Sequence, residues 1–485
     1  MKQLNRANTH SQAPYPEKIL QFGGGNFLRA FADWMIDVYN EKMNADLGVL
    51  LVTSTGRNDY TTWQNQDGLY HVLTRGLRNG EIVDEKYLVK SISRILALST
   101  KWDTFLASAE NPEMRFVISN TTEAGIRFSP DDQITDTPPK EFPARLTLWL
   151  YHRYQFFNGN KEAGCIFIPT ELITKNGETL RKCILQYAEN WNIETGFKTW
   201  ILEANIFCNT LVDRIVPGIS RNALPEEKEK IGYQDTMMAQ GEPFHFWAIE
   251  GPAEVQKELP LDKVGLNVIF TDDLTPYRTR KVRILNGAHT SMVPVGYLFG
   301  IETVREAVEH EVMGEFVRRC LYDEIIPTLD LPAEELQQFA NDVLDRFKNP
   351  FIHHELISIS LNSTSKFKTR VLPSILEYKN RKGFLPDCLV FSMAALIHFY
   401  KGEYDQKEIP LKDDPDAIAF LKRLWEECKG SKPDFEKMAK EVLAWEKNWG
   451  SNLNDISGLT EKLAGYLFLV EQKGMEKVVE DILLG

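Results

Sequence analysis

The sequence has few cysteines, and none lies in a spacing typical of a metal site or a disulfide framework. There are six among 485 residues, namely Cys165, Cys183, Cys208, Cys320, Cys388 and Cys428. Scattered thiols in apolar contexts are typical of proteins in a reducing compartment. We therefore expect free cysteines, a cytoplasmic location and no metal.

A long apolar run and an apolar N-terminal leader are also missing. Residues 1–16, MKQLNRANTHSQAPYP, have no apolar core and predict no secretory signal. The most apolar window, residues 388–400, is too short to cross a bilayer and contains His398. The sequence thus predicts no membrane role.

An excess of basic residues is absent too. The net charge is −13 at pH 7, which argues against a nucleic-acid partner because phosphate binding needs a basic surface. A local basic pocket for a small anion is compatible with this charge. We expect small molecules as partners, and the sequence predicts no particular oligomeric state.

What the sequence contains is a change of pattern along its length. Apolar runs at 18–23, 48–54, 114–122 and 164–172 are typical of buried parallel strands. After about residue 275 the pattern changes to long amphipathic segments. Because one core rarely grows to 485 residues, we predict an α/β Rossmann-type domain at 1–275 and a mainly α-helical domain at 276–485.

A glycine cluster follows the first apolar run. Gly23, Gly24 and Gly25 stand between a predicted strand and a helical pattern that begins at Asn26. Glycines allow positive φ and close backbone approach, so a dinucleotide pyrophosphate could rest on the helix N-terminus. A plain strand-to-helix turn is the alternative, since Leu28 occupies the third glycine position of GxGxxG.

This interpretation predicts the residues that contact the cofactor. They are Phe22, Gly23, Gly24, Gly25, Asn26 and Phe27, with Asn120 and Thr121 at a later strand end. For the last two, ordinary strand-end capping is the alternative. The second strand lacks a following acidic residue for a ribose diol, so the turn does not decide between NAD and NADP. Arg57 could meet a 2′-phosphate or be a solvated loop residue.

The segment KVRILNGAHT, residues 281–290, carries the candidate chemistry. On a helix, Lys281, Asn286 and His289 share one broad face, so an ammonium, an amide and an imidazole can converge on one ligand. The ammonium can exchange a proton with an oxygen that the other two hydrogen-bond. This combination favours carbonyl reduction or its reverse. An exposed helix lysine and a core histidine are the structural alternatives.

Four segments together resemble a known family. QFGGGNFLRAF at 21–31, SNTTEAG at 119–125, CNTLVDRIVP at 208–217 and the segment at 281–290 are similar to those of the mannitol dehydrogenase family, the polyol-specific long-chain dehydrogenases. The likeness extends from about Tyr15 to the C-terminal helices. The order K-x4-N-x2-H after Asp272, Asp273, Pro276 and Tyr277 is highly specific.

The resemblance implies a Rossmann-type domain followed by a helical one, NAD as cofactor and no catalytic metal. It implies that Lys281 is the general acid/base and that His289 fixes the substrate. It also implies that Asn286 and Asn209 hold the reacting oxygen, and Lys366 matches a substrate-contacting lysine of the family.

One departure from the family bears on the substrate. Mannitol-active members have an arginine eight residues before the lysine, where this chain has Ser358. The departure suggests a uronate, whose carboxylate Lys366 or Arg370 could bind; surface solvation is the alternative for both. The implied reaction is the NAD-dependent, reversible reduction of D-tagaturonate to D-altronate. Fructuronate reduction, a mannitol-type polyol 2-dehydrogenase and, more distantly, a non-enzymatic cofactor-binding sensor are the alternatives.

Overall fold

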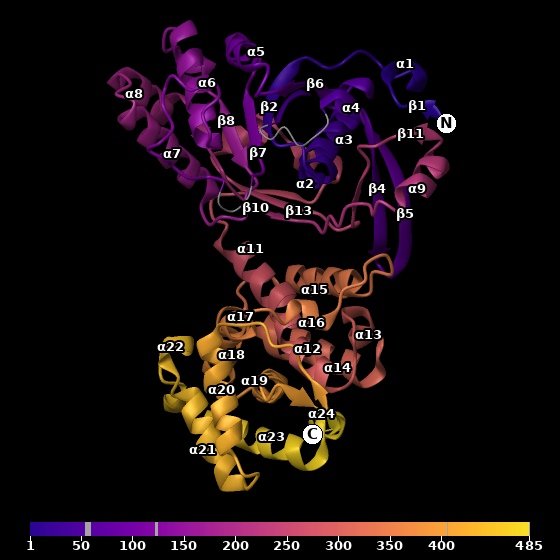
Figure 1. The fold of residues 1–485 in the computed structure, drawn as a ribbon, viewed down its shortest axis with the longest axis vertical. Helices are drawn as coiled ribbons and strands as arrows, with labels where there is room; N and C mark the ends of the chain where they lie inside the picture. The colour runs from indigo at the N-terminus through magenta and orange to yellow at the C-terminus, as the bar shows by residue number, and fades with distance from the viewer. Residues whose placement is uncertain (54–59, 122–124, 405, 485) are drawn as a thin grey trace. The chain divides into compact units, whose positions relative to one another are not determined.

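The computed structural model of the chain describes residues 1–53, 60–121, 125–404 and 406–484. Arg57 therefore lies outside the described residues. The chain divides into two compact units (Figure 1). The first consists of Met1–Arg75 and Ile82–Leu274, and the second of Gly76–Glu81 and Thr275–Gly485.

The first unit is built on a six-stranded parallel sheet. Its strand order is β6-β3-β2-β7-β8-β9. The strands are β2 (Glu17–Phe22), β3 (Gly48–Thr53), β6 (Ile92–Ala97), β7 (Phe116–Ser119), β8 (Ile166–Pro169) and β9 (Ile206–Phe207). The chain proceeds outward from β2 in one direction and then from β7 in the other. Ligands bind beyond the carboxyl ends of strands at such a reversal, which here is the edge after Phe22 and Ser119.

Successive residues of the strands pack into two separate cores. Val49 and Leu51 of β3 lie in a core with α3 (Trp34–Met43), whereas Leu50 and Val52 lie in the core on the opposite face. That opposite core contains residues of α5 (Trp102–Ala107), α6 (Phe142–Phe156), α7 (Asn176–Asn190) and α8 (Thr195–Ala204) (Figure 1). A strand buried on both faces is apolar over nearly its whole length, which explains the apolar runs of the sequence.

Two three-stranded sheets of the first unit were not predicted from the sequence. One has the order β12-β4-β5 and the other β10-β13-β14. Their strands are β4 (Tyr70–Arg78), β5 (Glu81–Val89), β12 (Ala239–Gly241), β10 (Asn209–Asp213), β13 (Phe246–Glu250) and β14 (Val268–Thr271). The sequence of β5, EIVDEKYLV, is largely exposed. It lacks the apolar alternation that marks a half-buried strand.

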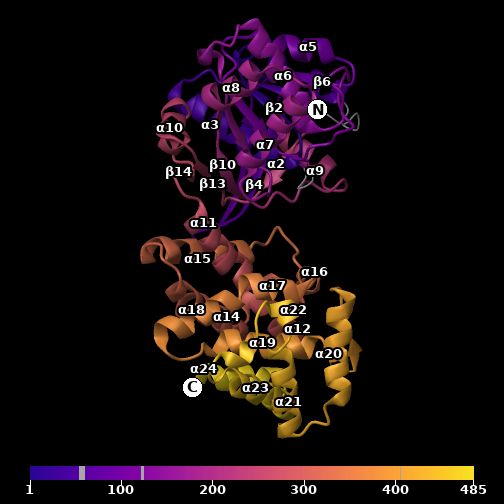
Figure 2. The ribbon, with the colours of Figure 1, turned by 90° about the vertical axis from the view of Figure 1, so that its left-hand side faces the viewer.

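The second unit consists mainly of helices around a buried central one. The helix α19 (Asp387–Phe399) packs against α12 (Gly287–Leu298) and α23 (Leu459–Lys473) (Figure 2). Every residue of α19 after Asp387 is buried, which accounts for the most apolar window of the sequence. Around these lie α13 (Val304–Glu309), α14 (Glu311–Arg319), α15 (Ala333–Phe347), α17 (Ser363–Arg370), α18 (Leu372–Lys382), α20 (Pro415–Glu427), α21 (Lys432–Leu443) and α24 (Met475–Leu484). Within the described residues, no helix combines the length and apolarity that a membrane crossing requires.

Candidate active site

The glycine turn joins β2 to a helical run that begins with α2 (Asn26–Leu28) and continues through a π-helical turn, Arg29–Asp33, into α3. Gly23 has a φ of +108°, and a Cβ there would lie 3.0 Å from the Asn120 carbonyl oxygen. Gly25 is the N-cap of α2 and has no side-chain cap. No heavy atom of the described residues lies within 4 Å of a Cβ built at Gly25. The turn therefore fits a pyrophosphate, which needs open space before a helix N-terminus.

A buried carboxyl lies beneath the turn. Gln21 Nε2 donates to the Gly23 carbonyl oxygen at 3.0 Å and to Asp33 Oδ2 at 3.2 Å. The Tyr70 hydroxyl also donates to Asp33 Oδ2, at 3.3 Å. Asp33 is fully buried, and this burial raises its pKa to about 7. This support was not predicted from the sequence, although a glutamine within an apolar strand is an available signal, since buried polar side chains require partners.

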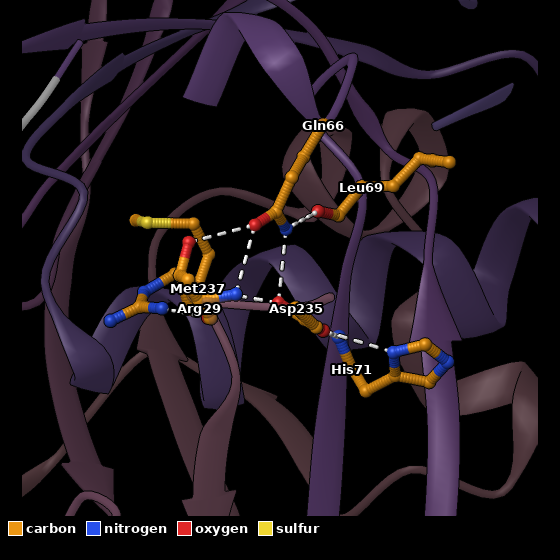
Figure 3. A network of polar contacts seen from close by, with 7 residues as sticks. Arg29, Gln66, Leu69, His71, Asp235 and Met237 are labelled. Carbon is orange, nitrogen blue, oxygen red and sulfur yellow. Dashed lines mark hydrogen bonds and ion pairs between the residues drawn. The ribbon is translucent and has the colours of Figure 1, made fainter. Parts of the chain in front are cut away.

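A second network holds the start of the helical run. The Asp235 carboxylate accepts hydrogen bonds from Gln66 Nε2, the Met237 amide and the His71 amide and ring, at 2.7–2.9 Å (Figure 3). The Arg29 guanidinium donates to the Met237 carbonyl oxygen and to Asn26 Oδ1. Asn26, a predicted cofactor contact, thus has its side-chain oxygen bound by Arg29.

The two phenylalanines predicted to contact the cofactor differ in their exposure. Phe22 is 3% exposed, with its ring centroid 4.7 Å from that of Phe142. Its ring therefore belongs to the core. Phe27 is half-buried and stacks on Phe31 with centroids 4.8 Å apart. Of the two rings, that of Phe27 retains surface for a ligand.

Asn120 and Thr121 lie at the predicted carboxyl edge and are bound to the loop after β8. Asn120 Nδ2 donates to the carbonyl and hydroxyl oxygens of Thr170, each at 3.0 Å. The amide and hydroxyl of Thr121 donate to Glu171 Oε1, each at 3.0 Å. Glu171 is buried, which raises its pKa. The strand-end capping considered for these residues is present, and it fixes the loop beside the glycine turn.

Asn209, at the start of β10, is 6% exposed, and its amide is engaged at both ends. Its Oδ1 accepts from the Glu178 amide at 3.1 Å. Its Nδ2 donates to Glu178 Oε1 at 3.1 Å and to Glu250 Oε1 at 2.7 Å. Binding a substrate oxygen would require Asn209 to exchange one of these two donated bonds.

In the second unit, a π-helical turn spans Lys281–Asn286 between α11 (Thr275–Arg280) and α12. On an α-helix, residues five apart are separated by about 140° around the axis. In a π-helix the hydrogen bonds span five residues, so Lys281 and Asn286 lie nearly above one another. Both are half-buried. The Asn286 amide makes no side-chain hydrogen bond within the described residues. The turn therefore aligns the predicted ammonium and amide better than the expected α-helix does.

His289 follows on the first turn of α12. Its ring stacks on Phe347, with centroids 4.2 Å apart, and contacts His354 edge to face at 5.4 Å. Its Nε2 is buried and has no hydrogen-bond partner within the described residues. Burial lowers the pKa of His289 well below its usual range, and the nearby basic side chains His354, Arg346, Arg370 and Lys366 lower it further. The imidazole is therefore neutral at pH 7.

Lys366 and Arg370 are both half-buried on α17. Lys366 Nζ donates to the Ile359 carbonyl oxygen at 2.8 Å, and its pKa is lowered by burial and by Arg370. Within the described part of the chain, the Arg370 guanidinium makes no hydrogen bond or ion pair. Ser358 is exposed and donates to the Glu355 carbonyl oxygen at 2.7 Å. The serine at the departure from the family pattern therefore supplies no charge.

The described residues include one group of side chains of metal-ligand type. The thiols of Cys320 and Cys388 and a carboxylate oxygen of Glu324 lie within 4.8 Å of one another, and all three residues are buried. Glu324 accepts from the Cys388 and Leu389 amides at 2.8 Å each, so its carboxylate caps α19. Its burial raises its pKa to about 7. All six cysteines are free, as predicted.

Comparison with protein families identifies the chain. A model described as the mannitol dehydrogenase Rossmann domain matches residues 17–263, and one described as the mannitol dehydrogenase C-terminal domain matches residues 273–467. The chain belongs to the mannitol dehydrogenase family. This match confirms the resemblance found in the sequence and the predicted fold class, a Rossmann-type α/β domain followed by a mainly helical one.

Similar curated proteins extend over the whole chain and share one name. An altronate oxidoreductase of Bacillus subtilis (strain 168) is 47% identical over 480 residues, covering 99% of this chain and 98% of the relative. Those of Phocaeicola vulgatus and Klebsiella pneumoniae (strain 342) are 47% and 44% identical, covering 100% and 99% of this chain and all of each relative.

Two solved structures share the fold. Substrate-free D-sorbitol dehydrogenase matches with a TM-score of 0.80 and 22% identity, covering 98% of this chain and 100% of that one. The ternary complex of Pseudomonas fluorescens mannitol 2-dehydrogenase with NAD and D-mannitol matches with a TM-score of 0.65 and 22% identity, covering 100% of both chains.

Proposed function

We propose that the chain is an NAD-dependent oxidoreductase that interconverts D-tagaturonate and D-altronate. The observation that carries the proposal is the π-helical turn that aligns Lys281 with Asn286, with His289 one turn further on. The relatives named altronate oxidoreductase, 44–47% identical over nearly the whole chain, support this reaction over others of the family. The free cysteines support a reducing compartment, and we propose a cytoplasmic location.

The cofactor assignment rests on the glycine turn. The positive φ of Gly23 and the open space before Gly25 suit the pyrophosphate of a dinucleotide. Asn120 and Thr121, fixed at the same sheet edge, are the proposed contacts to the nicotinamide ribose. The similar mannitol 2-dehydrogenase structure is a complex with NAD, which supports the choice of this cofactor. When bound, this cofactor donates or accepts the hydride.

Three residues of the second unit and Asn209 of the first are proposed to transfer the proton and to bind the substrate's oxygens. In reduction, Lys281 Nζ gives a proton to the ketone oxygen, and in oxidation it takes the proton of the alcohol. The Asn286 amide donates a hydrogen bond to the same oxygen, which stabilises its developing charge. Neutral His289 is proposed to bind a neighbouring hydroxyl through Nε2. Asn209 is proposed as a second amide, at the expense of a bond to Glu178 or Glu250. No step requires a metal.

The proposal is tested by following NADH oxidation with a panel of ketoses and keto acids. D-tagaturonate, D-fructuronate and D-fructose are compared at one pH, and NADPH replaces NADH in a parallel series. We expect the highest kcat/KM for D-tagaturonate with NADH, by about tenfold or more over D-fructuronate. A higher value for D-fructuronate or D-fructose would assign a sister activity, and no oxidation with any of them would contradict the enzyme class.

A further inference from the structure

We infer that Arg370 and Lys366 form the receptor for the substrate's carboxylate, and that they set the preference for a sugar acid over a neutral sugar. This inference rests on the proposed function and concerns the second unit alone. Residues four apart on a helix lie on one face, and like charges at this spacing destabilise the helix. Lys366 and Arg370 nevertheless have this spacing on α17, and both side chains are half-buried. An anionic ligand at this face would compensate both charges.

No acidic side chain of the described residues forms an ion pair with Lys366 or Arg370. Arg370 has no ion-pair or hydrogen-bond partner there, and Lys366 Nζ bonds to a main-chain oxygen, that of Ile359. Asp413 is the carboxylate whose charge acts on Lys366. It already accepts from the Thr364 amide and hydroxyl, at 3.0 Å each, and from the Tyr400 hydroxyl. The two cations therefore retain their capacity to bind an anion.

The surroundings of His289 point to the same ligand. Its electrostatic neighbours are His354, Arg346, Arg370 and Lys366, and no acid is among them. Its Nε2 is buried without a hydrogen-bond partner in the described residues. A buried polar atom without a hydrogen-bond partner destabilises the folded chain, so a ligand that hydrogen-bonds His289 Nε2 and also supplies negative charge would stabilise this site in both respects. A hydroxy acid has both kinds of group.

The chemistry of the two cations suits a carboxylate. A guanidinium can bind both oxygens of a carboxylate in a fork, whereas an ammonium acts as a point charge beside it. A neutral hexitol or ketohexose would leave both charges uncompensated in a half-buried site. This difference explains how a chain with Ser358 in place of the family arginine can favour a uronate.

The test uses a ligand pair that differs at the carboxylate. Binding of D-altronate and of D-altritol is measured by calorimetry in the presence of NADH. Because the ligand and the cofactor are then both in their reduced forms, no reaction takes place during the measurement. We expect wild type to bind D-altronate and Arg370→Met to bind it about 100-fold more weakly, with D-altritol binding unchanged. Arg370→Lys, which keeps a point charge, should lose about tenfold. Lys368→Met, on the same helix, is the matched control and should bind like wild type.

Kinetic measurements separate a failure of this inference from a failure of the proposed function. With D-tagaturonate, Arg370→Met should raise KM more than it lowers kcat, because the carboxylate is bound in both ground and transition states. If no hexuronate supports NADH oxidation by wild type, the proposed function fails. The binding comparison between D-altronate and D-altritol still tests the carboxylate receptor in that case. Equal losses for D-altronate and D-altritol in Arg370→Met, or unchanged D-altronate binding in both Arg370 variants, would overturn the inference.

Discussion

The polar side chains at the sheet edge of the first unit and those of the helical segment around Lys281 in the second unit differ in their hydrogen bonding to the protein. At the sheet edge, Asn120, Thr121 and Asn209 donate hydrogen bonds to neighbouring protein atoms. In the second unit, the Asn286 amide, His289 Nε2 and the Arg370 guanidinium lack such partners within the described residues. Unsatisfied polar groups are costly. The difference suggests that the first region offers a rigid main-chain surface and the second reserves its side chains for the substrate.

The largest expected effect is that of Lys281→Ala. Loss of the proton donor should lower kcat about 10³-fold, whereas NADH affinity, measured by fluorescence titration, should stay the same. Lys440→Ala, an exposed helix lysine of the same unit, is the control and should keep full turnover. Loss of NADH binding together with kcat in Lys281→Ala would assign the lysine to the cofactor instead.

The two candidate amides give the sharpest test of the comparison. Asn286→Ala should lower kcat about 10²-fold with little change in the melting temperature, because its amide has no protein partner within the described residues. Asn209→Ala should lower the free energy of unfolding by about 1–3 kcal/mol, because it removes the acceptor of the Glu178 amide and one hydrogen bond to each of the Glu178 and Glu250 carboxylates. Thermal melts and steady-state kinetics on both variants measure this contrast. A lower melting temperature for Asn286→Ala than for Asn209→Ala would contradict the proposed difference between the two regions.

A smaller effect is expected for substitutions in the glycine turn, where one glycine should matter for cofactor binding and another for the stability of the fold. An alanine at Gly25 meets no described atom within 4 Å, so Gly25→Ala should keep its melting temperature while NADH binds about tenfold more weakly. Gly23→Ala should instead destabilise the fold by about 1–2 kcal/mol, because its φ of +108° is unfavourable for other residues. Unchanged NADH affinity in Gly25→Ala would argue that the turn is a plain strand-to-helix connection.

The smallest effect on turnover is expected for Asp33→Asn, whose consequence is a change in stability with pH. The folded pKa of Asp33 is about 7, raised from 3.8. Between these values the folded state keeps a proton that the unfolded state releases, so this group makes wild-type stability fall as pH rises from about 4 to 7. Asp33→Asn does not titrate and should therefore gain stability relative to wild type between pH 5 and pH 8, as urea unfolding would show. The same difference at both pH values would mean that the carboxyl does not titrate in this window.

The sequence predicted those elements whose pattern lies within a few consecutive residues. The apolar runs located β2, β3, β7 and β8, and the glycine cluster marked the turn after β2. The π-helical turn at 281–286 could not be predicted, because the residues there fit the ordinary α-helical period and none of them indicates a wider turn. Residues far apart in the chain were also missed. His71 and Asp235 form a buried pair across 164 positions. Arg346 acts on His289 because Phe347, the next residue of α15, stacks on the His289 ring.

Gly287 links the two halves of the proposed substrate site in the second unit. A Cβ at this position would lie 3.1 Å from the main-chain oxygen of Arg370, so a larger residue would require the backbones of α12 and α17 to separate by a few tenths of an ångström. On the proposed assignment, rigid main-chain packing then sets how far the anion receptor lies from the amine that exchanges the proton. The length of a sugar acid, and not its charge alone, would decide whether it reaches both.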